Sequence, residues 1–267
     1  MTEAVLSVRD LRVEFSTRHG TLVALDGVSF DIAPGEVLGM VGESGAGKSL
    51  TGSAIIGLLE PPGRTTGGEI LLRGRRIDNL PASEMRGIRG KRIGMVFQDP
   101  LTSLNPLYTI AEQLIETIRT HRSLTASQAR LRAIELLDRV GIPAAARRID
   151  DYPHHFSGGM RQRVVIALAL CADPELVIAD EPTTALDVSV QAQILNLLKE
   201  LQDSLGVSFL FVTHNIGVVA YLADKVAVMH EGEIVEIGDA SQILNNPQAI
   251  YTKTLLSAVP QLNQTLV

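Results

Sequence analysis

A glycine-rich octapeptide between a predicted strand and a predicted helix constrains the fold of this chain most. The octapeptide is Gly42-Glu43-Ser44-Gly45-Ala46-Gly47-Lys48-Ser49, and it fits the phosphate-loop pattern G-x-x-x-x-G-K-[ST]. Just before it, Val37 to Val41 form a short apolar run that predicts a buried strand. A strand, a phosphate loop and a helix in this order predict an α/β fold built on a parallel sheet.

The residue types of this loop suit the binding of nucleotide phosphates. Glycines let consecutive backbone N–H groups point at phosphate oxygens, and the following helix adds the positive end of its dipole. We expect Lys48 to reach the β- and γ-phosphates, Ser49 to ligate Mg²⁺, and Leu50 to be a further nucleotide contact. An ordinary glycine turn is the alternative interpretation, but strand, loop and helix all agree with a nucleotide site.

A second candidate part of the site follows the apolar run Leu176 to Ala179. Asp180 stands at the carboxyl end of this predicted strand, where parallel sheets present ligands, and suits the Mg²⁺ shell. Glu181 is the candidate general base, because hydrolysis needs a carboxylate that polarises a water aligned on the γ-phosphate. The alternative for Glu181 is a carboxylate at a helix start near Pro182.

Composition limits the partners and the compartment that we expect. The 267 residues, 45% apolar and 20% charged, suffice for one large domain or two small ones. The net charge of -6 and the scattered Arg and Lys residues offer no basic stripe for nucleic acid. The first residues lack the pattern of a secretory signal, so none is expected. The longest apolar run, Val164 to Ala172, is about half of the ~18 residues of a membrane span. Cys171 is the single cysteine. These features predict a cytoplasmic protein that does not bind nucleic acid.

Hydrophobic patterning indicates two kinds of sheet. Alternating apolar positions and turn residues predict an N-terminal antiparallel sheet over residues 5 to 15, 21 to 33 and 67 to 78. Buried strands return at residues 176 to 179, 207 to 212 and 225 to 229. A helix separates the first two of these strands, with apolar Val190, Ile194, Leu197, Leu198, Leu201 and Leu205. Strands that alternate with helices predict a parallel sheet.

A mainly helical insert is expected between Asp99 and Cys171. Thr125 and Gln128 have the spacing of a capping box at a helix start. The apolar residues of this helix are Leu131, Ile134, Leu137 and Val140, and Gly141 with Pro143 ends it.

Four further motifs stand in the order found in ATP-binding-cassette ATPases, which the chain therefore resembles. They are Gln98 after the predicted strand Ile93 to Phe97, the signature Ser157-Gly158-Gly159-Met160, Ala185-Leu186-Asp187, and His214. Phe156 and Met160 replace the commoner Leu and Gln, and Asn215 stands where Asp is usual. The resemblance implies a P-loop NTPase cassette with a RecA-like parallel-sheet core, an N-terminal antiparallel β-subdomain and an inserted helical subdomain.

The resemblance also implies a role for each motif. Gln98 would contact Mg²⁺ and the attacking water and would sense the transmembrane partner, and His214 would contact the γ-phosphate. The signature Ser157 to Met160 would bind the γ-phosphate of nucleotide held by the opposite subunit, and Asp187 would lie at the dimer interface. Phe15 is the expected stacking partner of adenine, with a core phenylalanine as the alternative.

The resemblance extends from about Leu6 to Pro260 and implies one cassette domain over residues 1–260. Within it, residues 1–98 and 173–240 would form the nucleotide-binding core with the antiparallel β-subdomain. Residues 99–172 would form the helical signature subdomain, and residues 241–267 a short C-terminal tail.

Several longer stretches resemble the peptide and nickel importer subfamily. They are Gly42 to Gly45, Gln98 to Pro106, Tyr152 to Arg163, Ala179 to Gln193 and Asn246 to Pro260. This resemblance implies an ATPase that uses ATP and Mg²⁺ to power import of a di- or oligopeptide, nickel chelate or opine-like solute. Its partners would be a second ATPase subunit in a homo- or heterodimer, two membrane permeases and, indirectly, a periplasmic or extracellular solute-binding protein. The chain would then lie on the inner face of the cell membrane, and with a single cysteine it is expected to hold no iron-sulfur cluster.

The resemblance leaves one alternative function open, an accessory cassette of a soluble enzyme complex of the carbon-phosphorus lyase type. A cassette of DNA repair or translation would show a long coiled coil, two cassettes in one chain or a basic surface, and the sequence has none of these. A P-loop kinase would leave Ser157 to Gly159 and His214 without a role.

Overall fold

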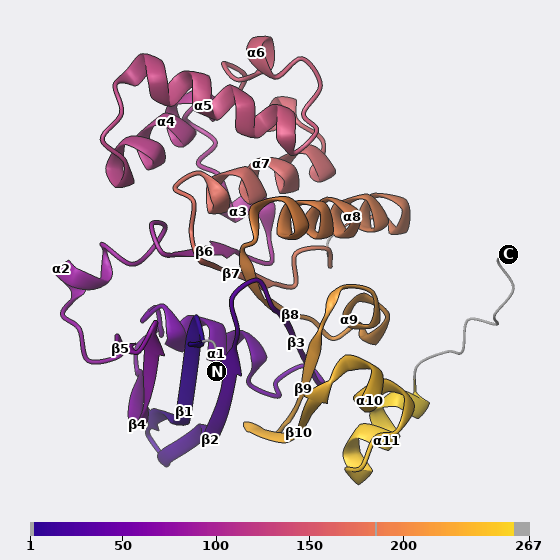
Figure 1. Ribbon diagram of the computed structural model, residues 1–267. Coiled ribbons are helices and arrows are strands. Elements are labelled where there is room, and N and C mark those ends of the chain that lie inside the picture. Colours follow the sequence, from indigo (N-terminus) through magenta and orange to yellow (C-terminus); the bar gives the residue numbers. More distant parts are fainter. Residues whose placement is uncertain (1–2, 185, 259–267) are drawn as a thin grey trace, which may run out of the picture.

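Two β-sheets and a layer of helices build the molecule. The computed structural model describes residues 3–184 and 186–258. A four-stranded sheet contains the N-terminal strands, a six-stranded sheet runs through the middle, and helices α3 to α7 lie on the far side of that middle sheet (Figure 1). This mixed α/β architecture confirms the predicted cassette fold class.

The N-terminal sheet is antiparallel, as the alternating pattern predicted. Its strands are β1 (Leu6–Thr17), β2 (Gly20–Ile32), β4 (Gly63–Leu72) and β5 (Arg75–Arg76), in the order β2-β1-β4-β5. Central strand β1 pairs Leu6 with Ile32 of β2 on one side and with Leu72 of β4 on the other. All three side chains are fully buried, which fixes the register of the sheet.

The six-stranded sheet is parallel except at one edge. Its strands are β3 (Val37–Val41), β6 (Ile93–Val96), β7 (Leu176–Asp180), β8 (Ser208–Val212), β9 (Lys225–His230) and β10 (Glu233–Asp239), in the order β10-β9-β3-β8-β7-β6. Every residue of β3, β7 and β8 is buried, as continuous apolar runs predict for strands covered on both faces. Edge strand β10 pairs antiparallel with β9 and was not predicted, because Glu233 and Glu236 interrupt its apolar pattern.

The helical insert begins its helices with side-chain caps. Its elements are α3 (Pro100–Ser103), α4 (Ile110–His121), α5 (Ala126–Arg139), α6 (Ala145–Arg148), the 3-10 turn η1 (Pro153–His155) and α7 (Gly158–Leu170). The capping box predicted at Thr125 and Gln128 is confirmed. The interpretation of Leu131 as part of the apolar face is wrong, because this residue is 61% exposed. Helix α5 instead turns the small residues Ala129 and Ala133 inward.

The remaining helices lie outside the insert, and the last of them follow strand β10 at the end of the chain. They are α1 (Lys48–Ile55), α2 (Ala82–Met85), α8 (Val188–Leu205), α9 (Ile216–Leu222), α10 (Ala240–Asn245) and α11 (Ile250–Ser257). Within the described residues, no helix combines the length and the hydrophobicity that a membrane crossing requires.

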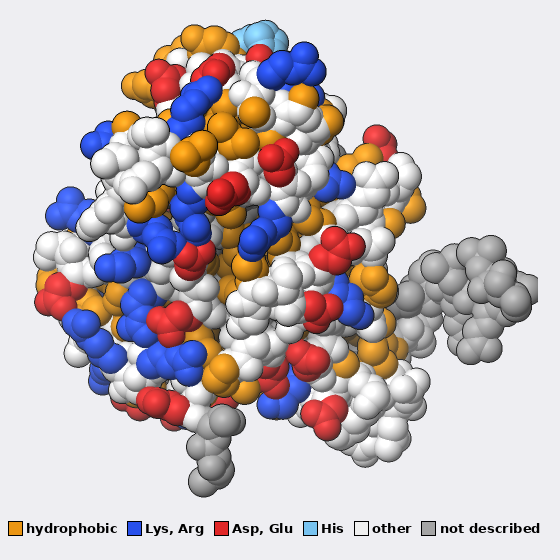
Figure 2. Space-filling model, turned by 45° about the horizontal axis from the view of Figure 1, so that its top comes forward, with side chains coloured by type: hydrophobic (Ala, Val, Ile, Leu, Met, Phe, Trp, Pro, Cys, Tyr) orange, Lys and Arg blue, Asp and Glu red, His pale blue; other side chains and the backbone are white. Residues whose placement is uncertain are grey.

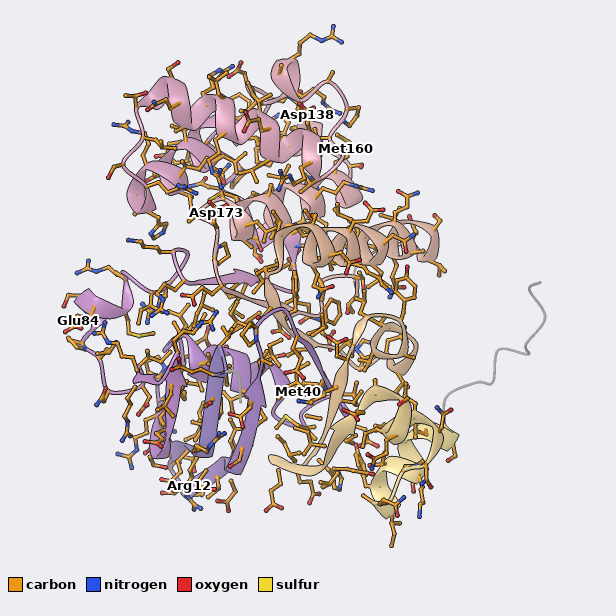
Figure 3. The ribbon with its side chains drawn as sticks, in the orientation of Figure 1. Arg12, Met40, Glu84, Asp138, Met160 and Asp173 are labelled. Carbon is orange, nitrogen blue, oxygen red and sulfur yellow. The ribbon has the colours of Figure 1, made fainter. Side chains whose placement is uncertain are left out.

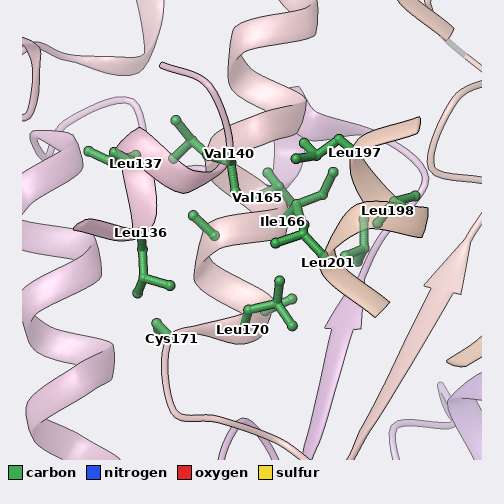
Figure 4. Packing of buried hydrophobic residues seen from close by; sticks show 14 of the residues in the cluster. Leu136, Leu137, Val140, Val165, Ile166, Leu170, Cys171, Leu197, Leu198 and Leu201 are labelled. Atoms are coloured by element: carbon green, nitrogen blue, oxygen red, sulfur yellow. The ribbon is translucent and has the colours of Figure 1, made fainter. Parts of the chain in front are cut away.

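A hydrophobic core joins the helical layer to the sheet. Leu137 of α5, Ile166 of α7 and Leu198 of α8 belong to one buried cluster (Figure 4). The same cluster contains Val177 of β7. Cys171 is fully buried in the same cluster, and this burial raises the pKa of its thiol to about 12. The core therefore fixes the end of α7 against the strand that leads to Asp180.

Charged side chains of both signs mix on the surface. Figure 2 shows Lys and Arg side chains beside Asp and Glu on the face that carries the helical layer. Arg130, for example, donates to both carboxylate oxygens of Asp150, at 2.8 and 2.6 Å. Such exposed pairs contribute little stability, roughly 0–1 kcal/mol each.

Gly94 of β6 allows α7 to pack closely on the sheet, which yields a stability prediction. A Cβ on Gly94 would lie 2.3 Å from the carbonyl oxygen of Ala169, a backbone atom that cannot move alone. Gly94→Ala is therefore expected to lower the free energy of unfolding by roughly 1–3 kcal/mol, measured by urea denaturation. Gly67→Ala is the control, since its Cβ would meet the Arg12 side chain at 3.3 Å. Equal destabilisation by the two variants would contradict this packing argument.

Candidate active site

The phosphate loop lies between β3 and α1, as its sequence pattern predicted. Gly47 caps α1 with φ of 102°, a left-handed conformation that favours glycine. A Cβ at this position would also lie 2.6 Å from the Leu25 side chain. In the described part of the chain, no side chain caps α1 at its start, so the first N–H groups of the helix are open to an anion at the end of the loop.

Lys48 is held inside the loop by the loop's own carbonyl groups. Its Nζ donates to the carbonyl oxygens of Gly42 at 2.9 Å and Glu43 at 2.8 Å, and the residue is only 5% exposed. Burial lowers the pKa of Lys48, while the negative charges of Glu181 and Asp180 oppose this shift. The ammonium group is thus positioned within a site that also holds two carboxylates.

Asp180 and Ser49 place two oxygen ligands side by side. The Ser49 hydroxyl donates to Oδ1 of Asp180 at 2.7 Å. Burial raises the pKa of Asp180, and the hydrogen bond from Ser49 acts in the opposite direction. Hydroxyl and carboxylate oxygens are the donors that Mg²⁺ prefers, so the pair fits the metal expected from the sequence.

Glu181 lies in a turn directly after β7, and no helix begins at it. Its φ of 45° is unusual for a residue other than glycine. Its Oε1 lies 3.0 Å from Nδ1 of His214, and its Oε2 accepts from Gln98 Nε2 at 3.1 Å and from Thr184 Oγ1 at 2.9 Å. Burial raises the pKa of Glu181, but the hydrogen bonds with His214 and Thr184 and the nearby ammonium of Lys48 together outweigh it, so the net pKa is lowered. The carboxylate therefore stays ionised near neutral pH.

A cavity of about 800 Å³ brings Lys48, Ser49, Gln98, Glu181 and His214 together, whereas Asp180 is not among the residues that line it. Its lining residues are Leu22, Val23, Ala24, Ser44, Gly45, Gly47, Lys48, Ser49, Leu50, Gln98, Glu181, His214, Glu231 and Gly232. Of the predicted loop residues, Gly42, Glu43 and Ala46 are not among the described residues that line it. The sequence reasoning missed the wall formed by β2 and by the turn between β9 and β10, where Gly232 N–H donates to Ala46 O at 3.1 Å.

Phe15 lies outside this lining. It is half-buried on β1 between Leu22 of β2 and Gly63 of β4. A Cβ on Gly63 would lie 2.7 Å from the Phe15 ring, so the ring covers that strand. Stacking of Phe15 on adenine stays a prediction.

The signature residues lie at the start of α7, away from the cavity. Ser157 is the N-cap of the helix, and its hydroxyl accepts from the N–H of Met160 at 3.4 Å. Arg148 lies over the Phe156 ring at 4.5 Å and fixes the preceding turn. Figure 3 shows Met160 in the helical layer, well apart from Met40 of β3, the strand that leads to the phosphate loop. One copy of the chain therefore does not bring Ser157, Gly158 and Gly159 to its own cavity.

The motif that precedes α8 is only partly described. Asp187 is exposed and is the N-cap residue of α8, without a side-chain hydrogen bond to the helix. Leu186 is partly buried against the core, and Ala185 lies outside the described residues.

Comparison with known proteins gives the family. A family model described as "ABC transporter" matches residues 25–184. The chain belongs to this family. It is 50% identical over 262 residues to the oligopeptide transport ATP-binding protein OppD of Bacillus subtilis, covering 98% of this chain and 73% of the relative. It is also 51% identical over 262 residues to the dipeptide transport ATP-binding protein DppD of the same organism, covering 98% and 78%.

Solved cassettes share the fold. The ATP-binding cassette MJ0796, in a dimeric post-hydrolysis state bound to ADP and Pi, is 29% identical with a TM-score of 0.78, covering 88% of this chain and 98% of that one. CbiO1 from Clostridium perfringens, part of the ABC transporter complex cbiONQ, is 31% identical with a TM-score of 0.76 and covers 90% of each chain. The family and these neighbours establish the chain as an ATP-binding ATPase of the ABC transporter type.

Proposed function

We propose that this ATPase powers the import of di- or oligopeptides, or of a nickel chelate or opine-like solute, through a pair of membrane permeases. The observation that carries the proposal is the cavity in which Lys48, Ser49, Gln98, Glu181 and His214 meet. The names of the relatives, oligopeptide and dipeptide transport ATP-binding proteins, support peptides as cargo. They do not favour a soluble lyase complex.

In the proposed mechanism, the phosphate loop binds the phosphates of ATP. Amides of the loop and of the first turn of α1 donate to phosphate oxygens, with Leu50 at the edge of the site. Lys48 turns its ammonium from the loop carbonyls toward the β- and γ-phosphates. Ser49, Asp180 and Gln98 would hold Mg²⁺, which neutralises charge on the transferred phosphoryl group when bound.

Glu181 would act as the general base in hydrolysis. An ionised carboxylate next to the phosphate loop can accept a proton from the attacking water. Gln98 donates to one of its oxygens and His214 contacts the other, so both side chains orient the carboxylate. His214 would also contact the γ-phosphate, and Asn215 caps α9 by accepting from Gly217 N–H at 2.9 Å, which fixes the backbone beside His214.

A second cassette would complete the site. Ser157 to Met160 lie exposed or half-exposed at a helix N-terminus, where the helix dipole favours an anion. Since they do not line the cavity of their own chain, we infer that they bind the γ-phosphate of nucleotide held by a partner, as a homo- or heterodimer. Asp187 would lie between the two cassettes. The dimeric state of MJ0796 supports this arrangement.

The segment after Gln98 is the proposed contact with the permeases. Leu101, Leu107 and Tyr108 are 61%, 81% and 52% exposed. Exposed apolar side chains that lie close together mark a surface for contact with another protein. Leu104 of the same segment is only 2% exposed and belongs to the core, so it takes no part in this contact. The complex would lie on the cytoplasmic face of the membrane and receive solute from a periplasmic or extracellular binding protein.

Leu107→Asp tests this contact. The substitution is expected to lower solute uptake by cells at least tenfold, because a charge would enter the apolar contact with the permease. ATP hydrolysis by the purified chain should stay within twofold, since Leu107 does not line the nucleotide cavity. Leu131→Asp, at an exposed leucine of α5, is the matched control. Normal uptake with Leu107→Asp would contradict the proposed contact.

The partners themselves test the function as a whole. The tagged chain, purified from its own cells with mild detergent, is expected to bring down two integral membrane subunits, identified by mass spectrometry. Soluble lyase subunits in their place would contradict the proposal. Transport of radiolabelled dipeptide by these cells then identifies the cargo class.

A further inference from the structure

A tyrosine near the C-terminus contacts the phosphate loop from outside the cavity. Tyr251 of α11 accepts a hydrogen bond at its hydroxyl oxygen from the backbone N–H of Glu43, at 3.4 Å. Its ring stacks on His230, the last residue of β9, with centroids 3.9 Å apart and planes inclined by 22°. The contact links the loop to a segment far away in the sequence.

Tyr251 and Lys48 hold the same peptide group. The N–H of Glu43 and the carbonyl of Gly42 belong to one peptide unit, and in a trans peptide these two groups point in opposite directions. Tyr251 binds the N–H, while the carbonyl oxygen accepts from Lys48 Nζ at 2.9 Å. Rotation of this peptide would therefore break both contacts and would move the oxygen that positions Lys48.

Helix α11 is fixed independently of this contact. Glu236 of β10 accepts from the N–H groups of Gln248 at 2.7 Å and Ala249 at 3.0 Å, just before the helix. Leu255 and Tyr251 pack beside a buried cluster that contains Val41, the last residue of β3. Tyr251 is thus presented to the loop from an anchored helix.

The strand end that carries His230 also leads to a second contact with the loop. His230 is followed by Glu231 and Gly232, which line the cavity, and Gly232 N–H donates to Ala46 O at 3.1 Å. The loop is therefore held at Ala46 by the turn after β9 and at Glu43 by Tyr251, whose ring stacks on His230 of that strand.

We propose that Tyr251 is a positioning residue for the phosphates of the nucleotide. It fixes the Gly42–Glu43 peptide and, through it, the starting position of Lys48. The proposal rests on the proposed role of Lys48 in phosphate binding, and it gives the C-terminal helix a part in the site that its sequence does not reveal.

Tyr251→Phe tests the proposal because it removes the hydroxyl and keeps the stacked ring. We expect the Kd for ATP, measured by calorimetry on the full chain, to rise roughly 2- to 10-fold, as loss of one hydrogen bond predicts. The Kd for tripolyphosphate, which lacks the base and the sugar, should rise by the same factor. In ATP hydrolysis, KM should rise while kcat stays within twofold, a separation that general destabilisation would not produce.

Tyr221→Phe is the matched control. The Tyr221 hydroxyl also makes one hydrogen bond, to Asn196 at 2.6 Å, and the Tyr221 ring lies under Lys199. These contacts join α9 to α8 and do not involve the phosphate loop. Binding is measured at a temperature where circular dichroism shows all variants folded. Unchanged affinity of Tyr251→Phe for ATP, or weaker binding of ATP but not of tripolyphosphate, would overturn the proposal. Failure of the unsubstituted chain to bind ATP would instead contradict the proposed function.

Discussion

Replacing Glu181 by Gln is expected to lower ATP turnover by roughly 10²- to 10⁴-fold, the usual contribution of a general base. The amide cannot accept the proton of the attacking water, yet it keeps the shape of the side chain. ATP should remain bound, and two cassettes should stay closed around it. Phosphate release measures turnover, and size-exclusion chromatography with ATP and Mg²⁺ measures the closed dimer.

The control for this variant is Glu200→Gln, on the exposed side of α8. It removes the same charge away from the cavity and should leave turnover within twofold. Turnover of Glu181→Gln near that of the unsubstituted chain would exclude Glu181 as the base. Lost turnover with no ATP-dependent dimer would instead place the role of Glu181 in nucleotide binding.

Replacing Lys48 by Ala is expected to weaken ATP binding by roughly 10- to 150-fold, the range for loss of a hydrogen bond to a charged group. Lys48 is the charged side chain held within the phosphate loop, where burial strengthens its attraction to phosphate. The loss should be larger for ATP than for adenosine, since adenosine has no phosphate. Calorimetry with both ligands measures the difference.

Lys199→Ala provides the comparison for the lysine variant. Lys199 is exposed on α8 and lies over the ring of Tyr221, so its removal changes net charge equally without touching the loop. Its affinity for ATP should match that of the unsubstituted chain. Equal weakening by both substitutions would show that net charge, and not the position of Lys48, governs binding.

The sequence predicts those parts of the fold that local patterns determine. Strands β3 and β7 are buried on both faces, so each forms a continuous apolar run. The capping box at Thr125 is equally local, because both partners lie within one turn. Strand β10 was not predicted because an edge strand does not need a continuous apolar run. Leu131 was wrongly assigned to the buried face of its helix because apolar residues also occur on exposed helix faces.

The residues of the site divide in the same way, into those that local sequence patterns reveal and those that depend on packing between distant segments. Lys48 lies in the loop motif that follows β3, Asp180 is the last residue of β7 and Glu181 follows it, so local patterns in the sequence reveal all three. The contribution of Leu22 and Val23 to the cavity wall depends on how the antiparallel sheet lies against the loop, which no local pattern specifies. Tyr251 reaches Glu43 only through the packing of α11 on β10. The Glu231-Gly232 turn after the apolar run of β9 is a sequence signal that could have indicated part of the cavity wall.

Peptide-dependent ATP hydrolysis by the assembled transporter tests the central proposal most directly. The chain, copurified with its permeases and reconstituted in lipid vesicles, is mixed with binding protein loaded with dipeptide. We predict that hydrolysis rises severalfold over the rate with empty binding protein, and that Glu181→Gln in this chain abolishes the rise. A rate that does not respond to loaded binding protein, or that persists with Glu181→Gln, would contradict the account.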